Sequence, residues 1–167
     1  MANVKVSYGT SSALTQTNLD GLAASATHVA GWESAEIDNT TNLFIDYRIA
    51  AKIQVESAGL AAGQIRLYLV GPLDDTTWPD VFDGTESAET VTDTEVRDAI
   101  CRLGAITETD TTASRTYYLE CPSVRAVFGG NLPKKFVVFI TQSTTTTLET
   151  TGDPNQVYLT GVFETVV

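Results

Sequence analysis

The 167 residues of the chain fit one domain that is long enough to bury a core of its own, so a second domain is not expected. The formal net charge of −11, with ten Lys and Arg in all, argues against binding to nucleic acid or to anionic membranes. Such acidity favours solubility, and contact with a basic partner surface is the alternative. Abundant Thr, Val, Ile, Tyr and Phe favour strands over helices.

The first residues predict a short strand followed by a less regular segment. Apolar and polar residues alternate at positions 4–8, whereas residues 10–26 are small and polar and fit an arm, a loop or a weak edge strand. We therefore divide the chain into residues 1–26, an N-terminal strand and arm-like segment, and residues 27–167, a β-sandwich domain. The start lacks a secretory signal and no run is apolar enough to span a bilayer, so we expect synthesis in the cytoplasm.

The fold is organised around one long predicted strand, residues 43–55. Its odd-numbered residues form one apolar face: Leu43, Ile45, Tyr47, Ile49, Ala51, Ile53 and Val55. Because strand side chains point alternately to opposite faces, we expect this face to be buried. Residues 27–37 predict a preceding strand with a bulge at Gly31, and residues 64–70 are expected to form a hairpin with the long strand.

The middle of the chain is less regular. Residues 72–95 show no clear period, but apolar anchors such as Phe82 lie among their acidic residues, so we expect this loop to pack. Residues 96–106 fit both a helix and a strand, and we favour a strand at about residues 101–107. Residues 115–121 predict the next strand.

The two cysteines depend on how these strands pair. If residues 101–106 and 116–121 form a hairpin, Cys101 and Cys121 lie close together. Free thiols are the default in a reducing compartment, and a disulfide formed later is the alternative.

The last third of the chain completes the prediction of an all-β fold. Residues 122–128 predict a helical turn, residues 135–142 a core strand that is apolar on both faces, and residues 156–167 a closing strand. About eight strands with long end loops and no long helix predict a single-domain β-sandwich of the jelly-roll type. An immunoglobulin-like sandwich ranks second, because neither Trp lies between the two Cys.

No residue is assigned a catalytic, cofactor-binding or metal-binding role. His28 is the only histidine, and nothing in the sequence ties it to a Ser or Cys nucleophile or places a Cys at zinc-ligand spacing. We therefore predict that the chain is not an enzyme and uses no cofactor.

The acidic loop of residues 74–89 is the one cluster with a chemical alternative. Calcium needs several converging oxygens, which four carboxylates could supply: Asp74, Asp75, Asp80 and Asp83. The EF-hand spacing is missing, and solvated carboxylates are the simpler interpretation. A glycosidase pair would need a carboxylate separation that the sequence does not set. Trp32 and Trp78 fit sugar-stacking residues or buried anchors, and anchors are commoner for Trp.

Three segments carry a resemblance to a known class of proteins. They are residues 30–43 (AGWESAEIDNTTNL), 79–85 (PDVFDGT) and 128–134 (FGGNLPK). In this order and spacing the chain resembles virion structural proteins of tailed bacteriophages, of the head decoration or cement type, over roughly residues 25–167. The resemblance implies a jelly-roll-like protein on the capsid surface of the virion. It also implies that the protein is commonly a trimer, with the major capsid protein as its partner.

Two functions from different classes follow. The first is a capsid-binding structural protein that stabilises the assembled head. The alternative is a tail or fibre-associated β-sandwich module that binds a host surface glycan through Trp32 or Trp78. A small hydrolase that uses the acidic loop is a third and weaker interpretation.

Overall fold

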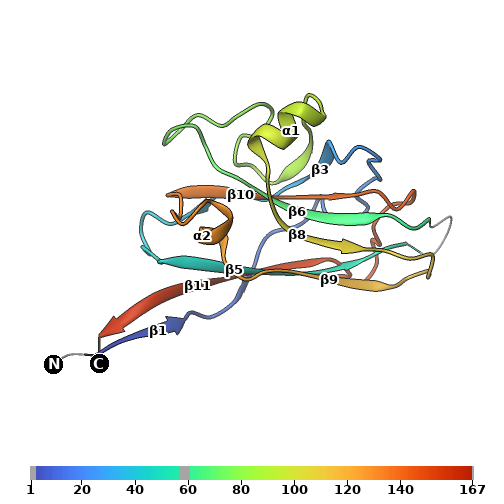
Figure 1. Ribbon diagram of the computed structural model, residues 1–167. Helices are drawn as coiled ribbons and strands as arrows, with labels where there is room; N and C mark the ends of the chain where they lie inside the picture. Colours follow the sequence, from blue (N-terminus) through green and yellow to red (C-terminus); the bar gives the residue numbers. More distant parts are fainter. Residues whose placement is uncertain (1–2, 57–60, 167) are drawn as a thin grey trace.

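The computed structural model describes residues 3–56 and 61–166, which fold into two antiparallel β-sheets packed face to face (Figure 1). Eleven strands and two short helices are described in these ranges, against about eight strands expected. Four of the strands, β2, β3, β4 and β7, are only two to four residues long. The prediction of an all-β sandwich is confirmed. No helix in these ranges is long and apolar enough to cross a membrane.

The first sheet has the order β1-β11-β5-β9, with β2 paired to β11 beside β1. Its strands are β1 (Val4–Tyr8), β2 (Ser12–Ala13), β5 (Asp46–Gln54), β9 (Thr116–Cys121) and β11 (Gln156–Val166). The predicted first strand and closing strand are both confirmed, and they are neighbours.

The second sheet has the order β7-β3-β10-β6-β8, with β4 paired to the start of β10. Its strands are β3 (Ala30–Glu33), β4 (Ile37–Asp38), β6 (Gln64–Val70), β7 (Ser87–Thr90), β8 (Arg102–Glu108) and β10 (Lys135–Gln142). Helix α1 (Thr94–Ile100) lies over the outer face of this sheet, and α2 (Val124–Val127) lies at one end of the sandwich (Figure 1).

The predicted hairpin of residues 43–55 with residues 64–70 is wrong, and the hairpin considered for residues 101–106 and 116–121 does not form, because the chain crosses between the sheets at both places. β5 pairs with β11 and β9 in the first sheet, whereas β6 pairs with β10 and β8 in the second. β8 and β9 are likewise in different sheets. The inner side chains of β5 and β6 belong to the same core cluster, because the two strands face each other across the sandwich.

The alternation of the long strand is confirmed from Tyr47 to Val55, where every odd-numbered side chain is buried. Its predicted start is wrong, since Leu43 is 72% exposed and has a φ of 51°, and β5 begins only at Asp46. The side chain of Asn39 explains the later start. Its Oδ1 accepts a hydrogen bond from the Phe44 nitrogen and its Nδ2 donates to the Phe44 oxygen, both at 2.9 Å. These bonds hold the preceding residues in a turn.

β10 is apolar on both faces because both faces of the second sheet are covered. Phe136, Val138 and Ile140 belong to the core between the sheets. Val137 and Phe139 belong to a second cluster with Phe82 and Val91 on the outer face, under α1 and the loop before it. The predicted core strand and the packing of the 72–95 loop are therefore confirmed.

Residues 27–37 form two short strands, β3 and β4, in place of the single bulged strand expected. The register of β3 with β7 runs without a shift through Gly31, so the predicted bulge is absent there. Glycine is needed for a different reason. A Cβ at this position would lie 2.5 Å from the backbone oxygen of Ile140, so the two backbones approach too closely for any side chain.

Both alternatives for residues 96–106 occur, one after the other. α1 ends at Ile100 and β8 begins at Arg102, and Asp93 caps the helix by accepting a hydrogen bond from the Val96 nitrogen. The helical turn predicted at residues 122–128 is confirmed as α2. Residues 10–26 contain the short edge strand β2 and then a loop that places Leu19 and Leu22 in the core.

Candidate functional site

The carboxylates of the acidic loop serve as local turn and loop anchors. Asp74 Oδ1 accepts hydrogen bonds from the nitrogens of Thr76 (2.8 Å) and Thr77 (2.6 Å), and these bonds lower the pKa of Asp74 to about 2. Asp80 accepts from the nitrogen (2.9 Å) and the hydroxyl (2.6 Å) of Thr92. Such bonds fix the path of a long loop without any ligand.

The other two predicted calcium ligands also face local partners. Asp83 accepts from the Thr85 nitrogen at 2.7 Å, and Asp75 forms an ion pair with Lys134 at 3.0 Å. Within residues 3–56 and 61–166, no three His, Cys, Asp or Glu side chains are grouped as metal ligands would be. The structure therefore does not bring the four carboxylates together.

Trp32 and Trp78, the two candidate sugar-stacking residues, differ in exposure. Trp32 on β3 is fully buried, and its Nε1 donates a 2.6 Å hydrogen bond to Oε1 of Glu86. Glu86 also accepts from the backbone and side-chain nitrogens of Asn18, so it joins the N-terminal segment to the loop. Trp78 is partly buried against the outer core cluster. Only Trp78 retains a surface on which a sugar could stack.

Glu33 is a buried carboxylate that sequence reasoning did not single out. It lies on β3 with no exposed surface, and its Oε1 accepts hydrogen bonds from the nitrogens of Gly84 (2.8 Å) and Asp83 (3.3 Å). Its Oε2 is buried without a hydrogen-bond partner in the described part of the chain. Burial raises the pKa of Glu33 to about 7, against the lowering effect of these two N–H groups. The side chain anchors the acidic loop to the second sheet.

His28 and the cysteines have structural surroundings. The His28 ring is buried, its Nδ1 lies 2.8 Å from the Thr141 hydroxyl, and burial together with Arg66 and Arg97 lowers its pKa to about 4. Cys101 and Cys121 are buried free thiols, as the default predicted. Burial raises the pKa of both, to about 12 for Cys101. Neutral thiols of this kind are poor nucleophiles.

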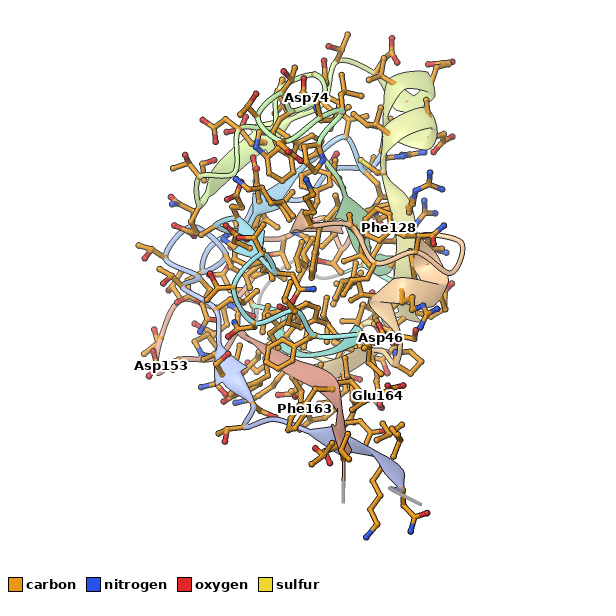
Figure 2. All side chains as sticks on the ribbon, turned by 90° about the vertical axis from the view of Figure 1, so that its left-hand side faces the viewer. Asp46, Asp74, Phe128, Asp153, Phe163 and Glu164 are labelled. Atoms are coloured by element: carbon orange, nitrogen blue, oxygen red, sulfur yellow. The ribbon has the colours of Figure 1, made fainter. Side chains whose placement is uncertain are left out.

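A group of exposed apolar residues lies on the first and last strands of the described chain. β5 accompanies β11 only as far as Val162, so beyond that residue β11 is paired with β1 alone in the described ranges. We call residues 4–8 and 162–166 the edge ribbon. Figure 1 shows it projecting from the sandwich with both chain ends at its tip. Figure 2 shows Phe163 and Glu164 at the end of the molecule opposite Asp74.

One face of the edge ribbon is mainly apolar and exposed, with Glu164 as its one charged residue and Val162 as its one buried residue. The register pairs Val4 with Val166, Val6 with Glu164 and Tyr8 with Val162, so these six side chains share a face. Four of the nine exposed large apolar residues of the described chain lie on it: Val4 (60%), Val6 (59%), Tyr8 (67%) and Val166 (69%). The alternation at positions 4–8 was the available signal, and it predicted a strand without predicting exposure.

The opposite face of the edge ribbon is fixed to the sandwich. Phe163 packs against Phe44 with ring centroids 6.1 Å apart, and Phe44 packs edge-on against the buried Tyr47 at 5.3 Å. These rings hold the base of the ribbon in a defined direction. The apolar face is therefore displayed by a supported element.

A shallow depression of about 270 Å³ lies near α2, lined by Pro72, Ile100, Arg102 and Phe128 among others. The Arg102 guanidinium carbon lies 5.7 Å from the Phe128 ring centroid. The volume of this depression is below the roughly 300–1,000 Å³ of small-molecule sites.

No protein-family model matches the chain, and no curated protein matches it in sequence. The fold and surface thus define a β-sandwich with an exposed apolar edge.

Proposed function

We propose that the chain is a structural protein of a bacteriophage virion, which binds and stabilises the assembled capsid at its surface. The resemblance of residues 30–43, 79–85 and 128–134 to decoration proteins motivates the proposal. The observation that carries it on the structural side is the group of exposed apolar residues on one face of the edge ribbon, because grouped apolar residues on a supported element are typical of a protein contact.

The strand order supports the jelly-roll part of this proposal. The first strand lies beside the last, and four strands of each sheet follow the orders β2-β11-β5-β9 and β3-β10-β6-β8. The chain passes from one sheet to the other at every step among these strands except from β6 to β8. Two Greek keys wound together produce this order. Jelly rolls serve in viral capsids and in lectins alike, so the fold alone does not choose between the two functions.

The distribution of charge suits a protein that binds an assembled lattice. Acidic side chains gather on the loop over the second sheet, while the edge ribbon carries only Lys5 and Glu164 as charged residues. A lattice site that spans several capsid subunits exists only after assembly. Many weak contacts made at once then raise the affinity for the particle above that for a free subunit. A symmetric oligomer, with the trimer implied by the resemblance, would match the local symmetry of such a site.

The glycan-binding alternative loses one of its two candidate residues. Trp32 is fully buried and its indole nitrogen is bonded to Glu86, so stacking on a sugar would depend on the partly buried Trp78. A glycan array with the purified protein and a Trp78→Ala variant tests this alternative. Saturable binding that the variant loses would favour the tail or fibre module over capsid binding.

The proposal is tested by mixing purified protein with capsids that lack it and separating bound from free protein by sedimentation. Capsids that already carry their full complement, and isolated capsid subunits, serve as matched controls. We expect saturable binding only to the capsids that lack the protein, and we expect salt to weaken this binding if the capsid face is basic. Light scattering gives the mass of the free protein. A protein that never co-sediments, or that binds free subunits equally well, would contradict the proposal.

A further inference from the structure

We propose that the edge ribbon associates with the edge ribbon of a second copy of this chain, by antiparallel pairing of β1 with β1 about a two-fold axis at Val6. This inference goes beyond capsid binding and stands on the geometry of the ribbon. It makes the first sheet continuous across two copies.

Among the strands that the structure describes, none pairs with the outer backbone edge of β1, which presents three residues. The Gly9 nitrogen donates a 2.8 Å hydrogen bond to the Gly161 oxygen, in register with the pairing of Tyr8 and Val162. Successive residues of an antiparallel pair alternate between facing the partner strand and facing away. The N–H and C=O groups of Val4, Val6 and Tyr8 therefore point away from β11. An edge of this kind is a template for another strand.

The open groups are self-complementary. In a two-fold pairing centred on Val6, that residue faces Val6 of the second copy, and Val4 faces Tyr8 of the second copy. Val4 and Tyr8 lie at equal distances on either side of Val6. A two-fold axis at Val6 therefore lets all three outward-facing residues exchange hydrogen bonds with the second copy. The centred register is the one that uses all of them.

The side chains agree with this register. Val4, Val6 and Tyr8 lie on one face of β1, so the exposed apolar residues of two copies join into one stripe. Lys5 faces Ser7 of the second copy, which keeps the two lysines from facing each other. Each Glu164 lies on β11, which is separated from the second copy by its own β1. Like charges are thus not directly opposed across the axis.

The rest of the surface favours this place of contact. A net charge of −11 opposes the approach of two copies, and the acidic loop lies at the end of the molecule away from the ribbon (Figure 2). β1 is only five residues long, so pairing two copies of it buries less surface than the roughly 800 Å² per partner that is typical of a stable complex. We therefore expect a weak, concentration-dependent dimer. A trimer built on another surface is compatible with it, and the two-fold contact would then join two trimers.

Sedimentation velocity at increasing protein concentration provides the first test. Wild-type protein should shift toward twice the mass of its smallest species. Val6→Pro removes the central outward N–H without removing a bond to β11, and proline is tolerated on strand edges that face solvent, so this variant should lose the shift and keep its melting temperature. Val6→Lys opposes two charges across the axis and should also lose it. Val6→Thr keeps the N–H and is the matched control, which should retain it.

Cross-linking tests the register itself. Two cysteines at position 6 would have Cα atoms about 5.5 Å apart, within the range that a disulfide spans. Mild oxidation should therefore link Val6→Cys into dimers. Tyr118→Cys is the control, since Tyr118 is also exposed (72%) and lies on β9 at the other edge of the same sheet. The native cysteines are both buried.

The outcomes separate this inference from the proposed function. A wild-type protein with no concentration-dependent association, and equal cross-linking of the two cysteine variants, would overturn it. Association that survives in both Val6→Pro and Val6→Lys would also overturn it. If the wild type does not associate and Val6→Pro abolishes co-sedimentation with capsids, the capsid occupies the edge and the second copy does not. Co-sedimentation of the wild type with capsids tests the proposed function, and its result does not depend on whether two copies associate.

Discussion

Trp32 and Glu86 are joined by a 2.6 Å hydrogen bond from the indole nitrogen to Oε1, although 54 positions separate them in the chain. The bond connects the second sheet to the acidic loop, and Glu86 extends it to the N-terminal segment through Asn18. The loop is therefore held by its own carboxylates and by buried partners beneath it.

Glu86→Ala should lower the free energy of unfolding by about 1–3 kcal/mol, because a buried indole N–H loses its acceptor. Urea denaturation of wild type and variant measures the difference. Glu95→Ala, which removes an exposed carboxylate from the first turn of α1, is the control and should cost less than about 1 kcal/mol. An equal decrease in the free energy of unfolding for the two variants would show that the hydrogen bond from Trp32 to Glu86 does not stabilise the fold.

Ile49→Ala or Ile53→Ala should cost about 2–5 kcal/mol, since both side chains are fully buried on the inner face of β5. Lys52→Ala, on the other face, should cost far less. Leu43→Ala should also cost little, because Leu43 lies outside the strand and is exposed. Thermal unfolding that ranked Leu43 or Lys52 above Ile49 would contradict the assigned face.

Gly31→Ala should destabilise the second sheet by about 1–3 kcal/mol. The added methyl group would meet the backbone oxygen of Ile140, which moves only if β10 moves. Gly71→Ala is the matched control, because a Cβ there lies 3.4 Å from Phe128, an ordinary contact. Equal melting temperatures for the two variants would mean that β3 and β10 can separate without cost.

Glu33 should make the protein more stable at mildly acid pH than at alkaline pH. Its pKa of about 7 in the folded state lies above the ordinary value of 4.5, so the folded state binds the proton more tightly. This contribution is fully present below about pH 4.5 and is lost as the pH rises through 7. The shift corresponds to about 3 kcal/mol. Asp83 and Glu89 face the group and add to the effect.

The measurement is urea denaturation of wild type and Glu33→Gln between pH 4.5 and 8. His28 acts in the opposite direction, because its lowered pKa of about 4 gives stability that is present above pH 6.5 and lost as the pH falls. Since His28 is common to both proteins, the difference between them isolates Glu33. The variant should be the more stable protein at pH 8, and its advantage should shrink toward pH 4.5. A difference that does not vary with pH would refute the assignment.

Treatment with EDTA should leave the melting temperature unchanged, because the four acidic-loop carboxylates already bond to Thr76, Thr92, Thr85 and Lys134 among others. Differential scanning calorimetry with and without added calcium checks this. A melting temperature that falls in EDTA and recovers with calcium would restore the calcium interpretation of the loop.

Most of the strands were predictable because the side-chain period of a strand is two. β1, β5, β6, β9, β10 and β11 all lie within the ranges that alternation or β-rich runs marked. The sequence was less decisive where short-range patterns overlap. Val96 and Ile100 have helical spacing immediately before the alternation of β8, and the structure contains both elements. The late start of β5 depends on the side-chain bonds of Asn39 to Phe44, which no periodicity reports.

The candidate site was predictable only in part. The composition of the acidic loop was visible, but the direction of each carboxylate depends on local partners such as Thr77 and Thr92. Glu33 lies in a segment that the sequence marked as a strand, and only packing of the loop over β3 buries its side chain. The apolar residues of β1 have the pattern of a half-buried strand, yet they are exposed because the ribbon extends past the end of β5.

The sequence by itself determined the class of the fold, most of its strands and which side of β5 is buried, because these depend on the order of apolar and polar residues along a local backbone. Only the tertiary structure decided which sheet each strand joins. Backbone hydrogen bonds between strands are the same for any partner, and the apolar face of a strand is buried against the opposite sheet whichever strand it pairs with in its own sheet. That choice also decided that β1 and β11 leave the sandwich together, and so exposed the surface on which both proposals depend.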